Sequence, residues 1–366
     1  MIYNIENNIV NRYKKIFNES EQDIDAFLVM NTEIADVNFR YLTGFTSGVF
    51  EDSYLIVEKE HATLITSPLE YETAKKMKPS IMDIINVRTG DELKNILKRM
   101  LESKKVGINE KFISISSYKE LKKINAKFID ASEILSNARA IKDEYEIENI
   151  RKANRITKKA LGEIEEYFKV GMTEKQLAAH LEFLFREYGG EDLAFETIVA
   201  FGQNSALPHH FSSDSKLKEN SFILIDCGTK YRNYCADVTR TFIFKPDKNS
   251  TKYKKMNKIY DTVKNAQMLG INSIHEGVYS NEPYEKVLNY INTVNNGAFK
   301  DTFIHSLGHP VGLNVHDEGP IMGRSKELLK ENMVLSVEPG IYIVGFGGVR
   351  IEDDVVIKKH GAEVLK

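Results

Sequence analysis

The feature that most restricts how this chain can fold is a pair of aspartates set between two apolar runs. Asp226 follows the run FILI at 222–225, and Asp237, eleven positions later, precedes the run VTRTFIF at 238–244. Both runs are rich in β-branched and aromatic residues, which predicts a hairpin of buried strands with carboxylates inside the core. A buried carboxylate without a partner costs several kcal/mol, so these groups must be neutral, paired or bound to a cation.

Three later stretches carry further possible metal ligands beside strand-like or turn-like sequence. They are HSLGHPVGLNVHDEG with His305, His309 and His316, SVEPGIY with Glu338, and GGVRIEDDVVI with Arg350 and Glu352. The first is not a two-histidine zinc helix, because Ser306 stands where that motif has its glutamate, and Gly308 and Pro310 disfavour a helix. Its glycines instead predict a tight backbone path past a crowded site. The third stretch predicts one strand face that carries both Arg350 and Glu352.

Five of these positions form a candidate metal site with four carboxylates and one imidazole: Asp226, Asp237, His309, Glu338 and Glu352. Ionised together in one cleft, the carboxylates would repel one another, and two divalent cations would balance their charge and leave room for a bridging hydroxide. Mainly oxygen ligands favour manganese, cobalt or iron over an ion that prefers thiolates. Each residue alone has an ordinary explanation as a turn, structural or ion-pairing group. The joint pattern favours the metal site.

The composition limits the class of protein and its partners. With 42% hydrophobic and 28% charged residues, the composition is typical of a globular protein. A length of 366 residues allows one large domain or two. A net charge of −3 from 50 basic and 53 acidic residues gives no overall field for nucleic acid or an anionic membrane, so neither is an expected partner. We expect no signal peptide and no membrane span, because the N-terminal stretch is interrupted by charge and no apolar run is long enough.

The chain contains two cysteines, Cys227 and Cys235, which is too few for a disulfide framework and predicts a cytoplasmic location. If Asp226 and Asp237 share one face of the hairpin, alternation places Cys227 on the opposite face. Cys235 then lies on the carboxylate face unless a bulge intervenes. Two free thiols are therefore expected.

The distribution of apolar residues predicts two differently built parts. Up to about residue 135, strand-like runs alternate with helical patterns, which predicts a sheet with helical crossovers. These runs lie at 26–30, 53–58, 62–66, 81–87 and 105–108. From about Asp143 a long amphipathic helix begins, and Thr173 with Gln176 forms a capping box for a second helix that ends at Gly189–Gly190. Short strands follow, with helical intervals near 251–270 and 282–298.

With these positions assembled, the sequence resembles the pita-bread metallopeptidases, the family of prolidase, aminopeptidase P and methionine aminopeptidase. The likeness runs from AIKDEYEIENIRKA through FETIVAFGQNSALPHH to GVRIEDDVVI, and VNFRYLTGF at 37–45 is similar to the N-terminal domain of creatinase and prolidase. The resemblance implies an α+β protein with two domains. These are a creatinase/prolidase-like α/β domain at residues 1–138 and a pita-bread catalytic domain at 139–366.

The resemblance also implies a role for each site residue. Asp226 would bind one metal ion, Asp237 and Glu352 would bridge both ions, and His309 and Glu338 would complete the set of ligands around the other ion. The remaining implied roles are a general acid/base at Glu338, substrate-steadying histidines at His209 and His316, a pocket histidine at His305, an orienting Arg350, and supporting donors at Thr239 and Tyr342. Two divalent ions are implied, with manganese favoured over cobalt, iron or zinc. Pro310 stands where many relatives have glycine, and no ligand position is lost.

The activity implied is hydrolysis of the bond between an N-terminal residue and proline in short peptides. An Xaa-Pro dipeptidase is expected, because the compact first domain and total length resemble microbial prolidases. The alternatives are an aminopeptidase P that acts on longer peptides, a non-catalytic pita-bread peptide-binding module, a creatinase, and a dimetal phosphohydrolase. The complete ligand set argues against the binding module and creatinase, and the lack of a glycine-rich phosphate loop argues against the phosphohydrolase. A homodimer is also implied.

Overall fold

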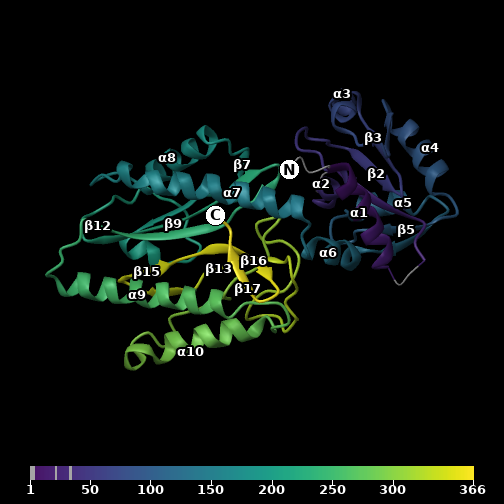
Figure 1. Cartoon of the computed structure of the whole chain (residues 1–366). Helices are drawn as coiled ribbons and strands as arrows, with labels where there is room; N and C mark the ends of the chain where they lie inside the picture. Colours follow the sequence, from purple (N-terminus) through teal and green to yellow (C-terminus); the bar gives the residue numbers. More distant parts are fainter. Residues whose placement is uncertain (1–4, 21–22, 33–34) are drawn as a thin grey trace. The chain divides into compact units, whose positions relative to one another are not determined.

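The computed structural model describes residues 5–20, 23–32 and 35–366. The chain divides into two compact units, Met1–Arg139 and Ala140–Lys366 (Figure 1). Both units contain helices and sheets, so the predicted α+β class with two domains is confirmed. Among the described residues, no helix is both long and apolar enough to cross a bilayer.

Within the described residues, the first unit is built on a mixed sheet of six strands in the order β4-β3-β2-β1-β5-β6. The strands β1, β2 and β3 pair antiparallel, and the other neighbours pair parallel. The strands are β1 (Ala26–Asn31), β2 (Ser53–Val57), β3 (Ala62–Thr66), β4 (Met82–Asn86), β5 (Lys105–Ile108) and β6 (Lys127–Asp130). The helices are α1 (Ile5–Asn18), α2 (Asn38–Thr43), α3 (Pro68–Met77), α4 (Gly90–Leu101), α5 (Ile115–Leu121) and α6 (Ser132–Ala140). All five predicted strands form, and β6, whose sequence KFID lacks an apolar run, was not predicted.

Helices cover both sides of the strands in the second unit: α7 and α8 lie on one side, and α9 lies on the other with α10 against it (Figure 1). Both predicted helix starts are capping boxes, from Asp143 to Glu146 and from Thr173 to Gln176. The helices are α7 (Glu144–Glu163), α8 (Glu174–Glu187), α9 (Thr251–Asn272) and α10 (Asn281–Gly297), with short 3-10 helices η1 (Ile164–Tyr167) and η2 (Gly202–Ala206).

The strands of the second unit form four small sheets in the orders β12-β9-β8, β11-β10-β7, β13-β16-β17 and β14-β15, all antiparallel. The strands are β7 (Asp192–Leu193), β8 (Ile198–Phe201), β9 (Ser221–Cys227), β10 (Thr229–Tyr231), β11 (Tyr234–Cys235), β12 (Val238–Phe244), β13 (Val334–Val337), β14 (Gly340–Ile343), β15 (Gly347–Arg350), β16 (Asp353–Lys358) and β17 (Gly361–Val364). One apolar core lies between α9, α10 and β13–β16, and another lies between α7, α8 and β8, β9 and β12.

The predicted hairpin is present but not continuous. The strands β9 and β12 pair antiparallel, with Asp226 opposite Thr239, yet the chain between them leaves the sheet to form β10 and β11. Cys235 therefore pairs with Lys230 in another sheet, and the prediction that alternation places it on the carboxylate face is wrong. Both thiols are buried and free, as expected.

The single strand predicted to carry Arg350 and Glu352 is also interrupted. Arg350 ends β15, and β16 starts at Asp353, so Glu352 lies in the break between two sheets. A hydrogen bond from Glu352 N to Thr239 O (3.1 Å) ties this break to β12. The two side chains still reach the same site, through the contacts described below.

Candidate metal centre

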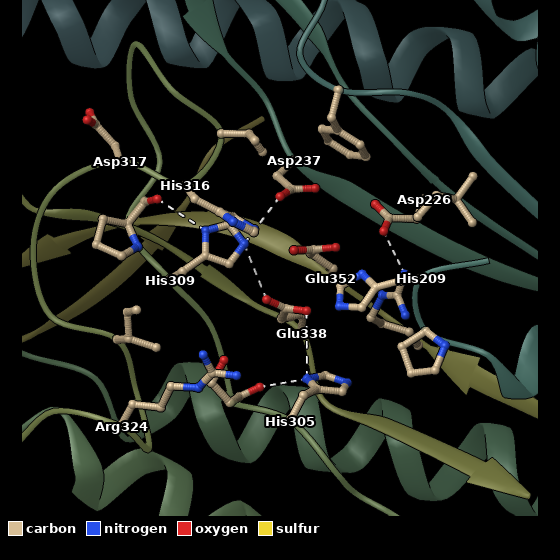
Figure 2. Close-up of a pocket in the computed structure, with 18 residues that line it drawn as sticks. His209, Asp226, Asp237, His305, His309, His316, Asp317, Arg324, Glu338 and Glu352 are labelled. Carbon is tan, nitrogen blue, oxygen red and sulfur yellow. Dashed lines mark hydrogen bonds and ion pairs between the residues drawn. The ribbon is translucent and has the colours of Figure 1, made fainter. Parts of the chain in front are cut away.

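One cavity of about 350 Å³ in the second unit gathers the nine residues proposed as metal ligands or catalytic groups, whereas the supporting donors Thr239 and Tyr342 lie outside its lining (Figure 2). Its lining includes His209, Asp226, Asp237, His305, His309, His316, Glu338, Arg350 and Glu352. The roles assigned to these residues remain predictions, but their convergence from six separate stretches of sequence does not follow from any local pattern.

The candidate ligands lie at strand ends, where side chains reach the cavity while their main chain stays in or beside a sheet. Asp226 is the penultimate residue of β9, and Asp237, Glu338 and Glu352 each lie one residue outside a strand. The segment that carries His309 runs alongside β13 through the bonds Ser336 N to His309 O (2.8 Å) and Glu338 N to Leu307 O (2.8 Å).

Gly308 shows why this segment needs glycine. A Cβ atom there would lie 1.9 Å from the carbonyl oxygen of Ser336. The predicted tight backbone path is therefore present, and no side chain could be accommodated without moving β13.

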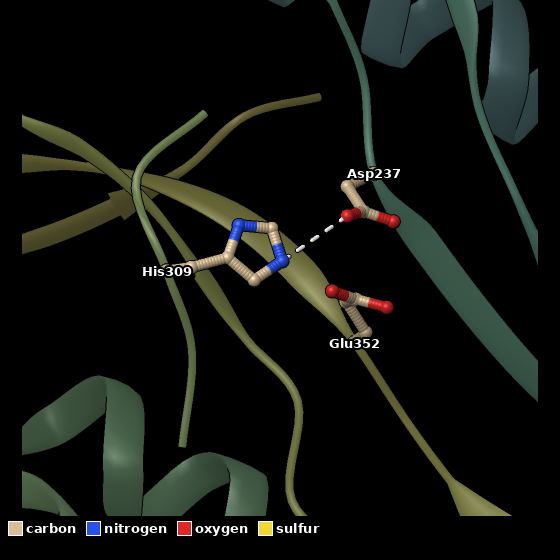
Figure 3. Close-up of side chains that lie close together, drawn as sticks. All are labelled: Asp237, His309 and Glu352. Atoms are coloured by element: carbon tan, nitrogen blue, oxygen red, sulfur yellow. Dashed lines mark ion pairs between the residues drawn. The ribbon is translucent and has the colours of Figure 1, made fainter. Parts of the chain in front are cut away.

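Asp237, His309 and Glu352 form the most compact group, in which one ligand atom from each lies within 4.8 Å of the others (Figure 3). The Nε2 atom of His309 is 3.4 Å from Asp237 Oδ2 and 3.4 Å from Glu338 Oε1. Asp226 and Glu338 line the same cavity but do not belong to this compact group.

The orientation of His309 is fixed by the main chain. Its Nδ1 atom lies 3.1 Å from the carbonyl oxygen of Pro310, and a carbonyl can only accept a hydrogen bond. Nδ1 therefore carries the proton, and in the neutral ring Nε2 presents its lone pair to the carboxylates. This is the arrangement in which a protein histidine ligates a metal.

The protein leaves some oxygens of these carboxylates without hydrogen-bond donors. Within the described part of the chain, Asp226 Oδ1 and Glu352 Oε1 are buried atoms without a hydrogen-bond partner. Burial and the nearby charge of Asp226 raise the pKa of Asp237 well above its usual range. Burial and the charge of Asp237 do the same to the pKa of Glu352. These buried carboxylate oxygens lack hydrogen-bond donors and lie beside the lone pair of an imidazole nitrogen. Together they form a set of ligand atoms that fits divalent cations.

Arg350 connects the candidate ligands to one another. Its guanidinium donates to Asp226 Oδ2 (2.6 Å), to Tyr342 Oη (2.8 Å) and to Thr239 Oγ1 (3.1 Å). Thr239 in turn donates to Glu352 Oε2 (2.6 Å). All three donor nitrogens of Arg350 are thus engaged by protein groups, and its role as an orienting residue stays a prediction.

Two further histidines, His305 and His316, lie in the cavity beside the candidate ligands. His305 donates from Nδ1 to Ser306 O (2.8 Å), and its Nε2 lies 2.8 Å from Tyr342 Oη. Burial lowers the pKa of both His305 and His316, and burial raises the pKa of Tyr342 to about 12. The His316 ring meets the His309 ring edge to face at 4.0 Å.

Sequence reasoning missed several residues that line the cavity. They include the apolar side chains of Phe195, Ile198, Pro208, Val315 and Ile321, and the charged side chains of Asp317 and Arg324. Asp317 forms a buried ion pair with Lys142 (3.5 Å). Among the described residues, the exposed guanidinium of Arg324 has no hydrogen-bond or ion-pair partner. No sequence signal distinguishes these residues from ordinary loop and surface positions.

The chain belongs to metallopeptidase family M24, whose model matches residues 148–359. The creatinase/prolidase N-terminal domain matches residues 12–141. These matches confirm the resemblance, and with it the expectation that the chain is a peptidase.

Similar proteins carry two related activities in their names. The chain is 36% identical over 337 residues to an Xaa-Pro dipeptidase of Pyrococcus furiosus, and these residues make up 90% of each chain. Its fold is similar to the X-Pro aminopeptidase of Thermotoga maritima MSB8, with a TM-score of 0.85, 34% identity and coverage of 93% of this chain and 95% of that one. It is equally similar to an Xaa-Pro dipeptidase from Bacillus anthracis, with a TM-score of 0.85, 31% identity and coverage of 98% and 97%.

Proposed function

We propose that this chain is a metal-dependent Xaa-Pro dipeptidase. The observation that carries the proposal is the single cavity in which four carboxylates meet a histidine while buried carboxylate oxygens lack donors. The names of the similar proteins support a proline-directed peptidase, and one of the solved structures leaves the aminopeptidase P alternative open.

In this proposal Asp226, Asp237, His309, Glu338 and Glu352 hold two divalent ions, with manganese favoured and cobalt, iron and zinc as alternatives. Such ions, when bound, make a hydroxide available at neutral pH and stabilise negative charge on the substrate carbonyl oxygen. All the other steps belong to side chains of the protein.

Glu338 is the proposed general acid/base. Its carboxylate faces the cavity, with Oε1 3.4 Å from His309 Nε2 and Oε2 3.9 Å from His305 Nδ1. It would accept the proton of the attacking water and return it to the nitrogen of the departing proline, which has no other proton to leave with.

His209, His305 and His316 are proposed to position the substrate. Because burial lowers the pKa of His305 and His316, these rings are neutral near pH 7 and can hydrogen-bond a peptide without adding charge. The apolar lining of the cavity offers a surface for the proline ring, which needs no hydrogen-bond partner. Ile198, Pro208 and Val315 are the nearest candidates for this contact.

Arg324 favours the dipeptidase over the aminopeptidase. A dipeptide presents the carboxylate of its proline inside the cavity, and a guanidinium without a protein partner is suited to bind it. In a longer peptide that carboxylate is replaced by a neutral amide, and the interaction is lost. Arg350 is less suited to this role because its donors are already used.

The test compares an Xaa-Pro dipeptide with the matched Xaa-Pro-Xaa tripeptide, using chelated protein and protein supplied with manganese or cobalt. Metal-dependent cleavage of the dipeptide alone supports the dipeptidase, and cleavage of both supports the aminopeptidase. Arg324→Gln should reduce kcat/KM for the dipeptide by about tenfold or more, since hydrogen bonds to charged groups contribute about 1.5–3 kcal/mol. Lys326→Gln, which changes charge equally but does not line the cavity, is the matched control. No cleavage of either peptide by metal-loaded protein would contradict the proposal.

We also propose a cytoplasmic homodimer, as the two free cysteines and the family resemblance suggest. Sedimentation of the full chain at several concentrations would test the assembly. A monomer at all concentrations would contradict it.

A further inference from the structure

A buried polar pair lies behind the candidate metal centre, outside the cavity. Asn154, from the middle of α7, and Asp354, from β16, are both fully buried. The Nδ2 group of Asn154 donates to Asp354 Oδ2 at 2.8 Å and to Ile150 O at 3.1 Å. Neither residue lines the cavity, so neither is a candidate to touch substrate.

The same oxygen of Asp354 also holds the main chain of a candidate ligand. Asp354 Oδ2 accepts a hydrogen bond from the backbone N–H of Asp237 at 2.9 Å. Asp237 lies in the gap between β11 and β12, where this N–H has no partner in a sheet. A buried N–H without an acceptor is costly, so the carboxylate both satisfies this group and fixes where the Asp237 side chain begins.

Asp354 is also two residues from Glu352, the other carboxylate of the compact group. The segment that carries Glu352 is attached to β12 by the bond from Glu352 N to Thr239 O (3.1 Å). The contact between Asp354 and Asp237 is a second attachment between the same two segments. Together they fix the distance between the two candidate bridging carboxylates, and Asn154 fixes the rotamer of Asp354 from a helix that does not reach the cavity.

We propose that Asn154 and Asp354 are positioning residues for the metal centre, acting through the main chain of Asp237. The inference rests on the proposed function, because it takes Asp237 and Glu352 to be metal ligands. Groups that hold ligands in place in this way typically change metal affinity by about 10–100-fold when they are lost.

Two pairs of nearly isosteric variants separate positioning from general stability and from charge. Asn154→Leu removes the donor to Asp354, whereas Thr157→Val removes another fully buried hydrogen bond of α7, in which Thr157 Oγ1 accepts from Thr229 N (3.2 Å), a residue that is not a candidate ligand and does not bond to one. Asp354→Leu and Asp354→Asn remove the same charge, but only the asparagine keeps an acceptor for Asp237 N.

The measurement is the dissociation constant of manganese, by calorimetric titration of the chelated full-length protein, with the thermal midpoint recorded for each variant. We expect affinity to fall by about tenfold in Asn154→Leu and by about 10–100-fold in Asp354→Leu, with a smaller loss in Asp354→Asn and none in Thr157→Val. Equal affinity in Asn154→Leu and wild type, or equal losses in the two Asp354 variants, would overturn the inference.

The outcomes also separate this inference from the proposed function. If the wild-type protein binds no manganese, the metal centre itself fails. If the wild type binds manganese and Asn154→Leu binds it as tightly, the positioning role alone fails. Should Asp354→Leu not fold, the comparison of Asn154→Leu with Thr157→Val still decides.

Discussion

Two buried carboxylate sites in the second unit differ in the number of hydrogen-bond donors that surround their oxygens. The side chain of Glu174, the first residue of α8, is fully buried and receives five hydrogen bonds from the segment 201–213. The donors are Phe201 N, Asn204 Nδ2, His210 Nε2, Ser213 N and Ser213 Oγ, at 2.6–2.9 Å. In the metal centre, by contrast, Glu352 Oε1 and Asp226 Oδ1 are buried atoms for which the described residues provide no donor.

The pKa values of the carboxyl groups in the two sites shift in opposite directions. Burial alone would raise the pKa of Glu174, but the hydrogen bonds from Ser213, His210 and their neighbours outweigh it, and the pKa is lowered. Burial and neighbouring carboxylates raise the pKa of both Asp237 and Glu352, and neither the charge of Arg350 nor the hydrogen bond from Thr239 to Glu352 offsets this rise. In this pair of sites, the carboxylate that belongs to the fold has donors on both of its oxygens, whereas two of the carboxylates proposed to bind a cation each have one buried oxygen without a donor.

The largest effect that would test this comparison is in activity. We expect Asp237→Asn or Glu352→Gln to reduce kcat/KM by more than about 100-fold, which is beyond what loss of a merely orienting partner causes. Because each substitution removes a charge that is unfavourable without metal, the unfolding free energy of the chelated protein should be unchanged or raised. Urea unfolding and dipeptide hydrolysis check the two expectations, with Glu276→Gln as an exposed control. Near-normal turnover in either variant would show that the residue is not a ligand.

Glu174→Gln should have the opposite consequence. The amide group would bring donors toward the N–H and O–H donors of Ser213 and Phe201, so a buried network would be broken. We expect the free energy of unfolding to fall by about 3 kcal/mol or more. Chemical denaturation of the chelated protein measures this change, and a loss below about 1 kcal/mol would mean that the donors do not matter as argued.

Tyr342→Phe tests the network behind the ligands rather than the ligands. It removes the acceptor for Arg350 Nη1 and the hydroxyl beside His305 Nε2, while Arg350 keeps its bond to Asp226. We expect kcat/KM to fall by about tenfold, and the free energy of unfolding to fall by about 1–3 kcal/mol because a buried guanidinium N–H loses its acceptor. Tyr260→Phe in α9, whose hydroxyl makes no contact with the cavity, serves as a control. An unchanged rate would show that Arg350 is held without Tyr342.

The smallest effect is the pH dependence of stability without metal. The raised pKa values of Asp237 and Glu352 mean that the folded protein binds more protons than the unfolded chain, whose carboxyls titrate near about 4. Above that pH, and up to the raised values, the stability contributed by these groups falls as pH rises. Glu174 has the opposite effect on stability. Its stabilising contribution is present above the pKa of the unfolded chain and is lost as pH falls through its lowered pKa in the folded protein.

We therefore expect the thermal midpoint of the chelated protein to decrease from about pH 5 to about pH 8, and the decrease to be shallower in Asp237→Asn. Differential scanning calorimetry at several pH values measures it. A midpoint that rises steeply over this range in the wild type and equally in Asp237→Asn would contradict the account.

The sequence predicted which candidate ligands line the cavity, because each of them lies next to a strand or turn with a local signal. Asp226 and Asp237 border apolar runs, Glu338 ends one, and Gly308 and Pro310 exclude a helix around His309. Five of the six strands described in the first unit and the four long helices of the second were predicted for the same reason, because their periodicity is local.

What could not be predicted depends on contacts between distant segments. Turn residues near 228–233 gave no indication that β10 would pair with both β11 and β7 and so interrupt the hairpin. The donors to Glu174 lie 27–39 positions away, and Asn154 lies 200 positions from Asp354. Arg324 is an ordinary arginine in the sequence, and only the tertiary structure shows that it lines the cavity without a partner.

The most direct test of the central claim is a titration of the chelated wild-type protein with manganese in two buffers of different ionisation enthalpy. If the unsatisfied carboxylates exist to hold cations, manganese will bind, protons will be released from Asp237 and Glu352 as it does so, and affinity will weaken as pH falls. Binding without proton release, or the same affinity in Asp237→Asn, would place the metal elsewhere, and no binding at all would contradict the account.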